Sequence, residues 1–269
     1  MPRPDVVQRY YDRIVRYEDR RLTLHPFEFH VTLGDFRRRV RRGAKVLDVA
    51  CGTGRYGEAL LESGCRVGLG DLSPSNVRLT RERLEGLQPL FVRAADALDP
   101  RAWEGGPWDA VLMLGPLYHL SRERDRLAVL RLARRNLRPR GLLYAAWISR
   151  MAAVWDGSRR WPEGVLRKRG TRRLLASGTG FNFAKNPSDF EAPYFCRPDE
   201  IGPTLARAGF EGIRVLGTEG PFGGRAELFR SIQEPRIRRA WLDFLLEHAE
   251  NPAFVWASEH ILSVARRER

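Results

Sequence analysis

Short apolar runs alternate with helical segments from residue 45 to residue 148, and few architectures accommodate this pattern. The apolar runs have the length and composition of strands buried in a parallel sheet. Parallel neighbours need crossover connections, which helices supply. The alternation therefore predicts an α/β fold with helices on both faces of the sheet, and its expected strands are 45–50, 65–70, 90–95, 109–114 and 141–148.

The helical segments carry recognisable ends. Ser73 followed by Pro74 is typical of a helix N-cap with proline at the first helical position, and the helix that it opens should reach about Leu84. The next helix is expected over 121–137. Arg140 occupies the turn before the fifth strand.

The remainder of the chain is less regular. We expect a helix near 199–208 disturbed by Pro203, a strand at 212–217, and a last strand at 259–267 that is antiparallel to its neighbours. We expect a single domain over residues 1–269. Its parts are a helical N-terminal cap (1–44), a ligand-binding core (45–150), two insertions that line a substrate pocket and act as a lid (151–192 and 218–256), and the last strand (259–267).

Composition excludes several classes of protein. The chain has 269 residues, of which 43% are hydrophobic, so a sizeable buried core is expected. Three cysteines without C-x-x-C spacing predict reduced thiols, no disulfide framework and no metal site. Neither a secretory h-region nor a run of about 18 apolar residues is present, so a cytoplasmic protein without a membrane span is expected.

The net charge of +14 raises nucleic acid as a partner. However, only three of the 47 basic residues are lysines, and the arginines are spread along the chain with denser patches at 37–42 and 159–173. A solvated basic surface explains this distribution, so a nucleic-acid partner is disfavoured.

A glycine-rich loop follows the first predicted strand. Gly52, Gly54 and Gly57 have the G-x-G-x-x-G spacing of a dinucleotide-binding loop, and Asp71 follows about 20 residues after it. Asp48 contradicts that interpretation, because a carboxylate beside the loop repels a pyrophosphate. The same carboxylate suits S-adenosylmethionine, which carries an ammonium and a sulfonium there and no phosphate. Asp71 suits either ligand, since both contain a ribose diol.

These residues resemble motif I of class I S-adenosylmethionine-dependent methyltransferases. The sequence VLDVACGTG matches that motif with Ala50 in place of its first glycine, and four further segments of residues 45–150 resemble later motifs in order. The resemblance implies a Rossmann-like seven-stranded sheet of order 3-2-1-4-5-7-6 with the last strand antiparallel. Within this resemblance LGPLYHL is typical of a bacterial subgroup without an assigned substrate.

The resemblance also implies the cofactor-binding residues. Asp71 corresponds to the ribose ligand, Leu72 to a neighbour of the adenine, Asp96 to the acceptor of the adenine amino group, and Ala97 to a backbone contact. The full set implied for S-adenosylmethionine, with no metal, is Asp48, Ala50, Gly52, Gly54, Asp71, Leu72, Asp96, Ala97 and Leu114. Asp96 also fits a turn before a helix without any ligand.

The methyl acceptor is expected beside the loop after the fourth strand. His119 is the candidate general base, because its ordinary pKa lies near neutrality, and Tyr118 is the candidate that shapes the pocket. Gly115 stands where base-methylating enzymes often have a polar acceptor. Tyr10 and Tyr11 belong to an aromatic helical segment that could cover the site or simply pack.

Three functions remain open from the sequence. The first is methyl transfer to an oxygen, nitrogen or carbon of a small molecule. The second is an RNA or protein methyltransferase that uses the 159–173 patch, and the third is a regulatory protein that binds S-adenosylmethionine without turnover. A dinucleotide oxidoreductase is disfavoured by Asp48. The sequence predicts no oligomeric state.

Overall fold

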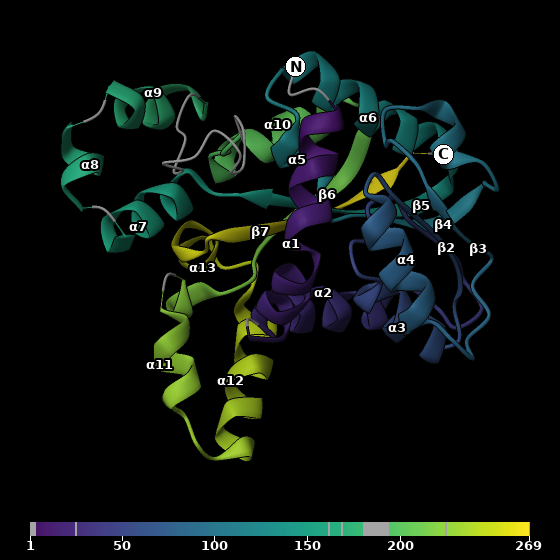
Figure 1. Ribbon diagram of the computed structural model, residues 1–269, viewed down its shortest axis with the longest axis horizontal. Coiled ribbons are helices and arrows are strands. Elements are labelled where there is room, and N and C mark those ends of the chain that lie inside the picture. Colours follow the sequence, from purple (N-terminus) through teal and green to yellow (C-terminus); the bar gives the residue numbers. More distant parts are fainter. Residues whose placement is uncertain are drawn as a thin grey trace.

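A seven-stranded sheet with helices on both faces forms the body of the molecule (Figure 1). The computed structural model describes residues 4–24, 26–160, 162–167, 169–179, 194–223 and 225–268. The strands are β1 (Lys45–Asp48), β2 (Arg66–Asp71), β3 (Phe91–Ala94), β4 (Trp108–Met113), β5 (Leu137–Ile148), β6 (Phe210–Gly217) and β7 (His260–Arg267).

Helices occupy most of the remaining described chain. They are α1 (Pro4–Leu24), α2 (Pro26–Arg39), α3 (Arg55–Glu62), α4 (Pro74–Arg83), α5 (Pro116–His119), α6 (Glu123–Asn136), α7 (Arg150–Arg160), α8 (Pro162–Arg167), α9 (Arg169–Ser177), α10 (Pro198–Arg207), α11 (Ala226–Ser231), α12 (Pro235–His248) and α13 (Pro252–Ala257), with 3-10 turns η1 (Pro100–Trp103) and η2 (Gly220–Phe222). The predicted cap at Ser73 is confirmed, since its hydroxyl accepts the Asn76 backbone N–H at 3.1 Å.

The strand order is β3-β2-β1-β4-β5-β7-β6, which confirms the expected order. Strands β1 to β5 run parallel, and β7 pairs antiparallel with both β5 and β6. The carboxyl ends of β1 to β6 and the start of β7 therefore lie at the same edge of the sheet. The chain direction across the sheet reverses between β1 and β4, and ligands of open α/β sheets bind at such a switch point.

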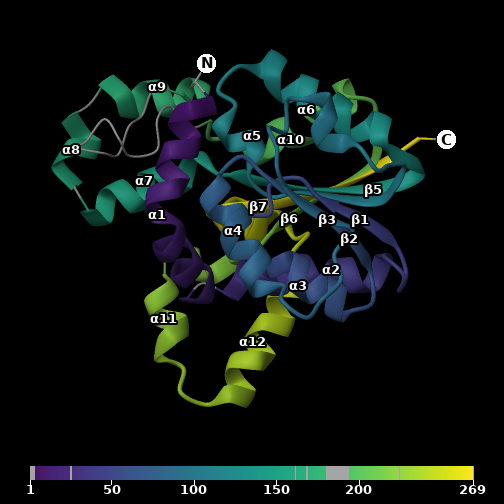
Figure 2. The same ribbon diagram turned by 45° about the vertical axis from the view of Figure 1, so that its right-hand side comes forward.

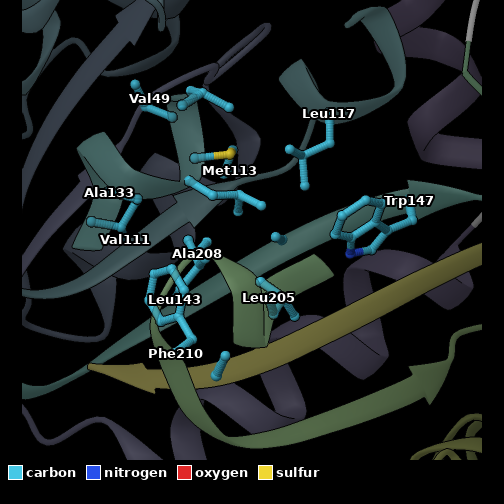
Figure 3. Close-up of a cluster of buried hydrophobic side chains, with 14 of the residues drawn as sticks. Val49, Val111, Met113, Leu117, Ala133, Leu143, Trp147, Leu205, Ala208 and Phe210 are labelled. Atoms are coloured by element: carbon cyan, nitrogen blue, oxygen red, sulfur yellow. The ribbon is translucent and has the colours of Figure 1, made fainter. Parts of the chain in front are cut away.

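Alternate residues of the central strands pack into separate cores on the two faces. Ala110 and Leu112 of β4 face the core beneath α2, α3 and α12. Val111 and Met113 of the same strand face the opposite core, where α6 and α10 cover the sheet (Figures 2 and 3). Both faces are dry, which explains why the strand sequences are apolar throughout rather than alternating.

The first insertion differs from the sequence expectation. Residues 151–192 show no sustained periodicity, yet the described part forms α7, α8 and α9, which project away from the sheet (Figure 1). These helices have 11, 6 and 9 residues. Segments so short span too few turns for a period to emerge. The insertion also contains Phe181, Phe183 and Phe190, which lie outside the described residues.

Strand β5 begins four residues earlier than the sequence predicted. Leu137 pairs with Trp108, the register then shifts, and regular pairing resumes between Leu142 and Ala110. Arg140 lies in this irregular stretch with a φ of 64°. The turn expected at this position is therefore an irregularity inside one strand. Its non-glycine residue, Arg140, has left-handed backbone angles.

Cys51, Cys65 and Cys196 are free, and all three are buried. None of the helices in the described part of the chain has the length and apolar character needed to cross a membrane.

Candidate active site

The carboxyl ends of β1 and β4 lie side by side at the switch point of the sheet. The Val49 backbone N–H donates to the Leu112 carbonyl at 3.0 Å, and the Cys51 N–H donates to the Gly70 carbonyl at 2.9 Å, so the loop after β1 continues between β2 and β4. A Cβ at Gly115 would lie 3.5 Å from the Cβ of Ala50 and 3.7 Å from the Tyr118 hydroxyl. The sequence-predicted Ala50 and Tyr118 are therefore brought together there.

The glycine loop turns sharply while leaving its backbone accessible. Gly52 has a φ of 55° and no atom within 4 Å of the place where a Cβ would stand. Gly54 has a φ of 81° and ends the loop as the N-cap of α3, and a Cβ there would lie 2.8 Å from Thr80. Gly54 is thus required by the fold, whereas the open space beside Gly52 lets a ligand approach the backbone.

Asp48 is a buried carboxyl group without a hydrogen-bond partner among the described residues. Its side chain ends β1 at 1% exposure, and neither Oδ1 nor Oδ2 forms a hydrogen bond. Burial, together with the charge of Asp71, raises the pKa of Asp48 to about 8, while the Ala50 backbone N–H acts in the opposite direction. A buried carboxylate is costly unless a cation or donor meets it. The site therefore fits a cationic ligand such as S-adenosylmethionine.

Asp71 is more fully satisfied than the sequence suggested. Its Oδ2 accepts the Gly52 backbone N–H at 2.8 Å, and its Oδ1 accepts the Ser73 N–H at 2.9 Å and the Asn76 amide at 3.0 Å. Burial raises its pKa, although these donors act in the opposite direction. A carboxylate has about four acceptor positions, so about one is left for a ribose hydroxyl.

The remaining residues implied for the adenine lie further along the same edge. Leu72 and Ala97 are half-buried after β2 and β3. The Asp96 carboxylate accepts the Leu98 N–H at 2.9 Å, as it would in a simple turn. Leu114 directly follows β4, and its carbonyl accepts the Tyr118 hydroxyl at 3.0 Å.

Helix α1 crosses the carboxyl edge over this site and is held by polar contacts at three strands. The Tyr11 hydroxyl lies 2.8 Å from Nε2 of His119, after β4. The Ser73 hydroxyl, after β2, donates to the Asp12 carboxylate at 2.5 Å, and this bond lowers the pKa of Asp12 against the opposing effect of its burial. Asp19 accepts the Thr53 hydroxyl of the glycine loop at 2.8 Å.

Asp12 and Asp19 are site residues that the sequence interpretation missed. Asp19 also pairs with Arg83 of α4 at 2.6 Å. Both acids lie in a strongly charged helical stretch, DRIVRYEDR, in which no spacing distinguishes them from solvent-facing residues. Tyr10 packs edge-on against Tyr11, with 5.2 Å between ring centroids, and Tyr11 contacts His119.

The placement of His119 changes what it can do. Its ring lies 4.9 Å from that of Tyr118 and 5.4 Å from that of Tyr11, and the Tyr11 hydroxyl occupies Nε2. An acceptor that is to meet Nε2 directly has to displace the Tyr11 hydroxyl. The structure thus gives His119 a contact that joins α1 to the β4 loop.

A second polar pair at the same edge was not predicted. Glu219 follows β6, and its Oε1 lies 2.5 Å from Nδ1 of His260, the first residue of β7. Each residue stands at the end of a predicted strand, in TEGP and EHIL. The antiparallel last strand brings them together, and this topology is the signal that would have identified the pair.

Within the described ranges, no group of three or more His, Cys, Asp or Glu side chains is arranged to hold a metal ion.

Comparisons with known proteins agree with this geometry. Residues 46–141 match the family model of the methyltransferase domain. The ubiquinone biosynthesis O-methyltransferase of Xanthomonas campestris pv. campestris (strain B100) is 34% identical over 114 residues, which is 42% of this chain and 46% of that protein. The chain therefore aligns with about half the length of this relative. The protein of the same name from Xanthomonas axonopodis pv. citri (strain 306) is 30% identical over 188 residues, 69% of this chain and 71% of that protein.

A solved structure shows the same fold. The N-methyltransferase NodS from Bradyrhizobium japonicum WM9, in complex with S-adenosyl-L-homocysteine, aligns with a TM-score of 0.55 at 15% identity, covering 93% of this chain and 91% of that one. One assignment follows from the strand order, the glycine loop and the relative that matches over more than two thirds of both chains. The chain belongs to the class I S-adenosylmethionine-dependent methyltransferases.

Proposed function

We propose that this chain transfers a methyl group from S-adenosylmethionine to a small-molecule acceptor, with oxygen as the favoured acceptor atom. The observation that carries the proposal is the buried Asp48 carboxyl group, which has no hydrogen-bond partner among the described residues and lies beside an open glycine loop. Oxygen is favoured over nitrogen or carbon because the relatives that match by sequence are named O-methyltransferases.

Each residue around the loop has a distinct role in this proposal. When bound, S-adenosylmethionine supplies a methyl group on a cationic sulfur that an aligned lone pair can displace. Asp48 holds the cationic part, Asp71 accepts a ribose hydroxyl, and Leu72, Asp96, Ala97 and Leu114 surround the adenosine. Helix α1 excludes water, which favours a displacement that needs alignment more than a base.

The acceptor should lie between the β4 loop and the insertions 151–192 and 218–256. Tyr118 shapes this side of the site, since its hydroxyl is fixed on the Leu114 carbonyl. His119 serves either as a base or as a link to α1. If His119 is a base, His119→Ala should lower turnover more than cofactor affinity.

Calorimetry tests the cofactor assignment. S-adenosylmethionine should bind with micromolar affinity and NAD should release no heat. Asp71→Ala should weaken S-adenosylmethionine binding at least tenfold, because a charge-assisted hydrogen bond contributes about 1.5–3 kcal/mol. The matched control is Asp199→Ala, which removes an exposed carboxylate on α10 and should leave the affinity unchanged. Unchanged affinity in Asp71→Ala would show that the ribose lies elsewhere.

Two alternatives are tested by other measurements. An RNA or protein methyltransferase would use the 159–173 patch, in which Arg169, Arg172 and Arg173 are exposed while Arg159 pairs with Glu259 at 2.9 Å. Steeply salt-dependent RNA binding would support it. A regulatory protein would bind S-adenosylmethionine without producing S-adenosylhomocysteine in any extract fraction supplied with labelled methyl groups.

A further inference from the structure

Helix α12 exposes an apolar stripe on a side that does not pack on the body of the molecule. Ile237, Ala240 and Phe244 are spaced by three and four residues, so they share one face of the helix. Ile237 is 48% exposed, Phe244 is 39% exposed, and Ala240 between them is also exposed. The buried side of the helix is a different one, where Leu245 belongs to the core that α12 shares with α2. The stripe therefore faces outward.

Aromatic contacts hold this stripe in one arrangement. The Phe244 ring lies 5.4 Å from that of Trp241, 4.4 Å from that of His248 and 5.7 Å from that of Phe254. Trp241 in turn packs edge-on against Phe222 of η2, with 5.2 Å between ring centroids. Helices α11 and α12 project from the sheet beyond α2, and the turn between them lies furthest out (Figures 1 and 2). The stripe is thus prominent and needs little rearrangement to meet a partner.

The charges of α12 run against its dipole. Arginines occupy its first half and acids its second half, namely Arg236, Arg238, Arg239, Asp243 and Glu247. A helix favours acids near its start and bases near its end, so this order stabilises neither end of the helix. It does suit a second α12 that runs in the opposite direction, because each basic half then meets an acidic half.

Arg236 and Glu247 are the exposed charges that this second helix would meet. Neither has an ion-pair partner among the described residues. They lie about three turns apart, which places them on the same side of the helix, beside the stripe, and too far apart to pair with each other. The other charges of α12 have contacts within the chain, which are Arg239 with Asp243 at 3.0 Å and Arg238 with the Ile232 carbonyl at 2.6 Å.

We propose that α12 is a self-association surface on which a second copy of this chain docks antiparallel about a two-fold axis. With the axis beside Ala240, Ile237 meets the partner's Phe244, and the small alanine lets the two helices approach closely. Because a two-fold axis repeats each contact, Arg236 faces the partner's Glu247 twice. A parallel arrangement would place like charges together, so the charge order selects the antiparallel one.

The charge of the whole chain disfavours most other contacts between copies. The net charge is +14, so two copies repel each other in most orientations. On α12, by contrast, both signs of charge flank the apolar stripe. One helix from each copy makes a small interface, so we expect a Kd of about 10–100 µM rather than a permanent dimer. The contact does not depend on the proposed methyl transfer.

Analytical ultracentrifugation tests the proposal by measuring the mass of the particle. The wild-type protein should shift from monomer to dimer between about 2 µM and about 400 µM. Ile237→Asp should keep the chain monomeric over this range, because it places a charge in the apolar stripe. Leu175→Asp is the matched control, since Leu175 of α9 is also 48% exposed, and this variant should dimerise as the wild type does.

An exchange of charges tests the antiparallel arrangement. Arg236→Glu and Glu247→Arg should each weaken dimerisation at least about tenfold, because each places two pairs of like charges across the axis. An equimolar mixture of the two variants should recover wild-type dimerisation, since both pairs in the mixed dimer are of opposite charge. Arg131→Glu, at an exposed position of α6, makes the same change in net charge as Arg236→Glu and should leave dimerisation unchanged.

The melting temperature of each variant separates docking from folding and should match that of the wild type. Where Ile237→Asp lowers it, the charge exchange alone decides. A wild-type chain that stays monomeric, dimerisation that survives Ile237→Asp, or a mixture that fails to recover would overturn the proposal. Monomers that bind phosphatidylglycerol vesicles, and lose this binding with Ile237→Asp, would assign the stripe to a lipid surface and would also overturn it.

Discussion

At the scale of single residues, Asp48 lowers the folding stability of the ligand-free protein. Its pKa of about 8 in the folded chain lies far above the ordinary value for an aspartate, so between about pH 4 and pH 8 the folded state binds a proton that the unfolded state has released. Stability therefore falls as pH rises through this window. The cost to stability agrees with the proposed role of Asp48 as the group that meets a cationic ligand.

Replacing Asp48 with Asn should separate these two effects. Asp48→Asn should raise the melting temperature of the ligand-free protein at pH 8, because no carboxylate has to be buried. It should also weaken S-adenosylmethionine binding at least tenfold, since the charge that meets the cation is lost. Scanning calorimetry and titration calorimetry measure the two quantities. A variant that is less stable and binds normally would contradict the role of Asp48.

The same pKa predicts that binding releases a proton. At pH 7 most of the ligand-free molecules hold the Asp48 proton, and a bound cation displaces it. Affinity should rise with pH up to about 8 and level off above it. At pH 7, the binding heat measured in buffers of different ionisation enthalpy should report release of about one proton. Asp48→Asn is the control and should show none.

Asp48 and Asp71 could be predicted from the sequence because they end strands beside a glycine loop. The contacts of Asp12, Asp19 and Glu219 could not be predicted, since they depend on how helices and strands far apart in the chain are placed. The sequence prediction assigned His119 to catalysis without the contact from Tyr11, which only the packing of α1 shows.

At the scale of elements, β5 contains a strained residue. Arg140 is exposed and has a φ of 64°, which a side chain with a Cβ disfavours. The sequence predicted a turn at Arg140, before the fifth strand. The alternation of apolar runs predicted the strands well, whereas this local distortion depends on the register between β4 and β5.

Arg140→Gly should stabilise the protein by about 0.5–1 kcal/mol, since relief of the left-handed strain exceeds the added flexibility of the unfolded chain. Denaturant unfolding measures the difference. Arg140→Ala is the matched control and should change little, because alanine keeps the Cβ that creates the strain. Stabilisation by Ala equal to that by Gly would assign the effect to loss of charge.

At the scale of the whole molecule, α1 closes the site by linking three strand ends. It contacts the loops after β1, β2 and β4 through Asp19, Asp12 and Tyr11. The sequence predicted a helical cap from its aromatic residues, but polar contacts make these links. In the proposed function the cofactor lies beneath α1, so its release requires some of these contacts to break.

Tyr11→Phe should increase the dissociation rate of S-adenosylhomocysteine about fivefold, because it removes one hydrogen bond of about 1 kcal/mol from the closed arrangement. Stopped-flow displacement measures this rate. Asp5→Asn, which removes only the exposed pair with Arg9 on the same helix, should leave the rate unchanged. An unaltered rate in Tyr11→Phe would mean that α1 does not gate release.

The position of β7 has a consequence for how the chain is made. Strand β6 lies at the edge of the sheet, with β7 as its neighbour in the described sheet. Residues 210–217 leave the ribosome well before residues 260–267, and until the later segment emerges they have no strand to join. The half of the sheet that carries Glu219 and His260 therefore cannot be completed before the last strand is made, whereas the strands on either side of the glycine loop are made much earlier.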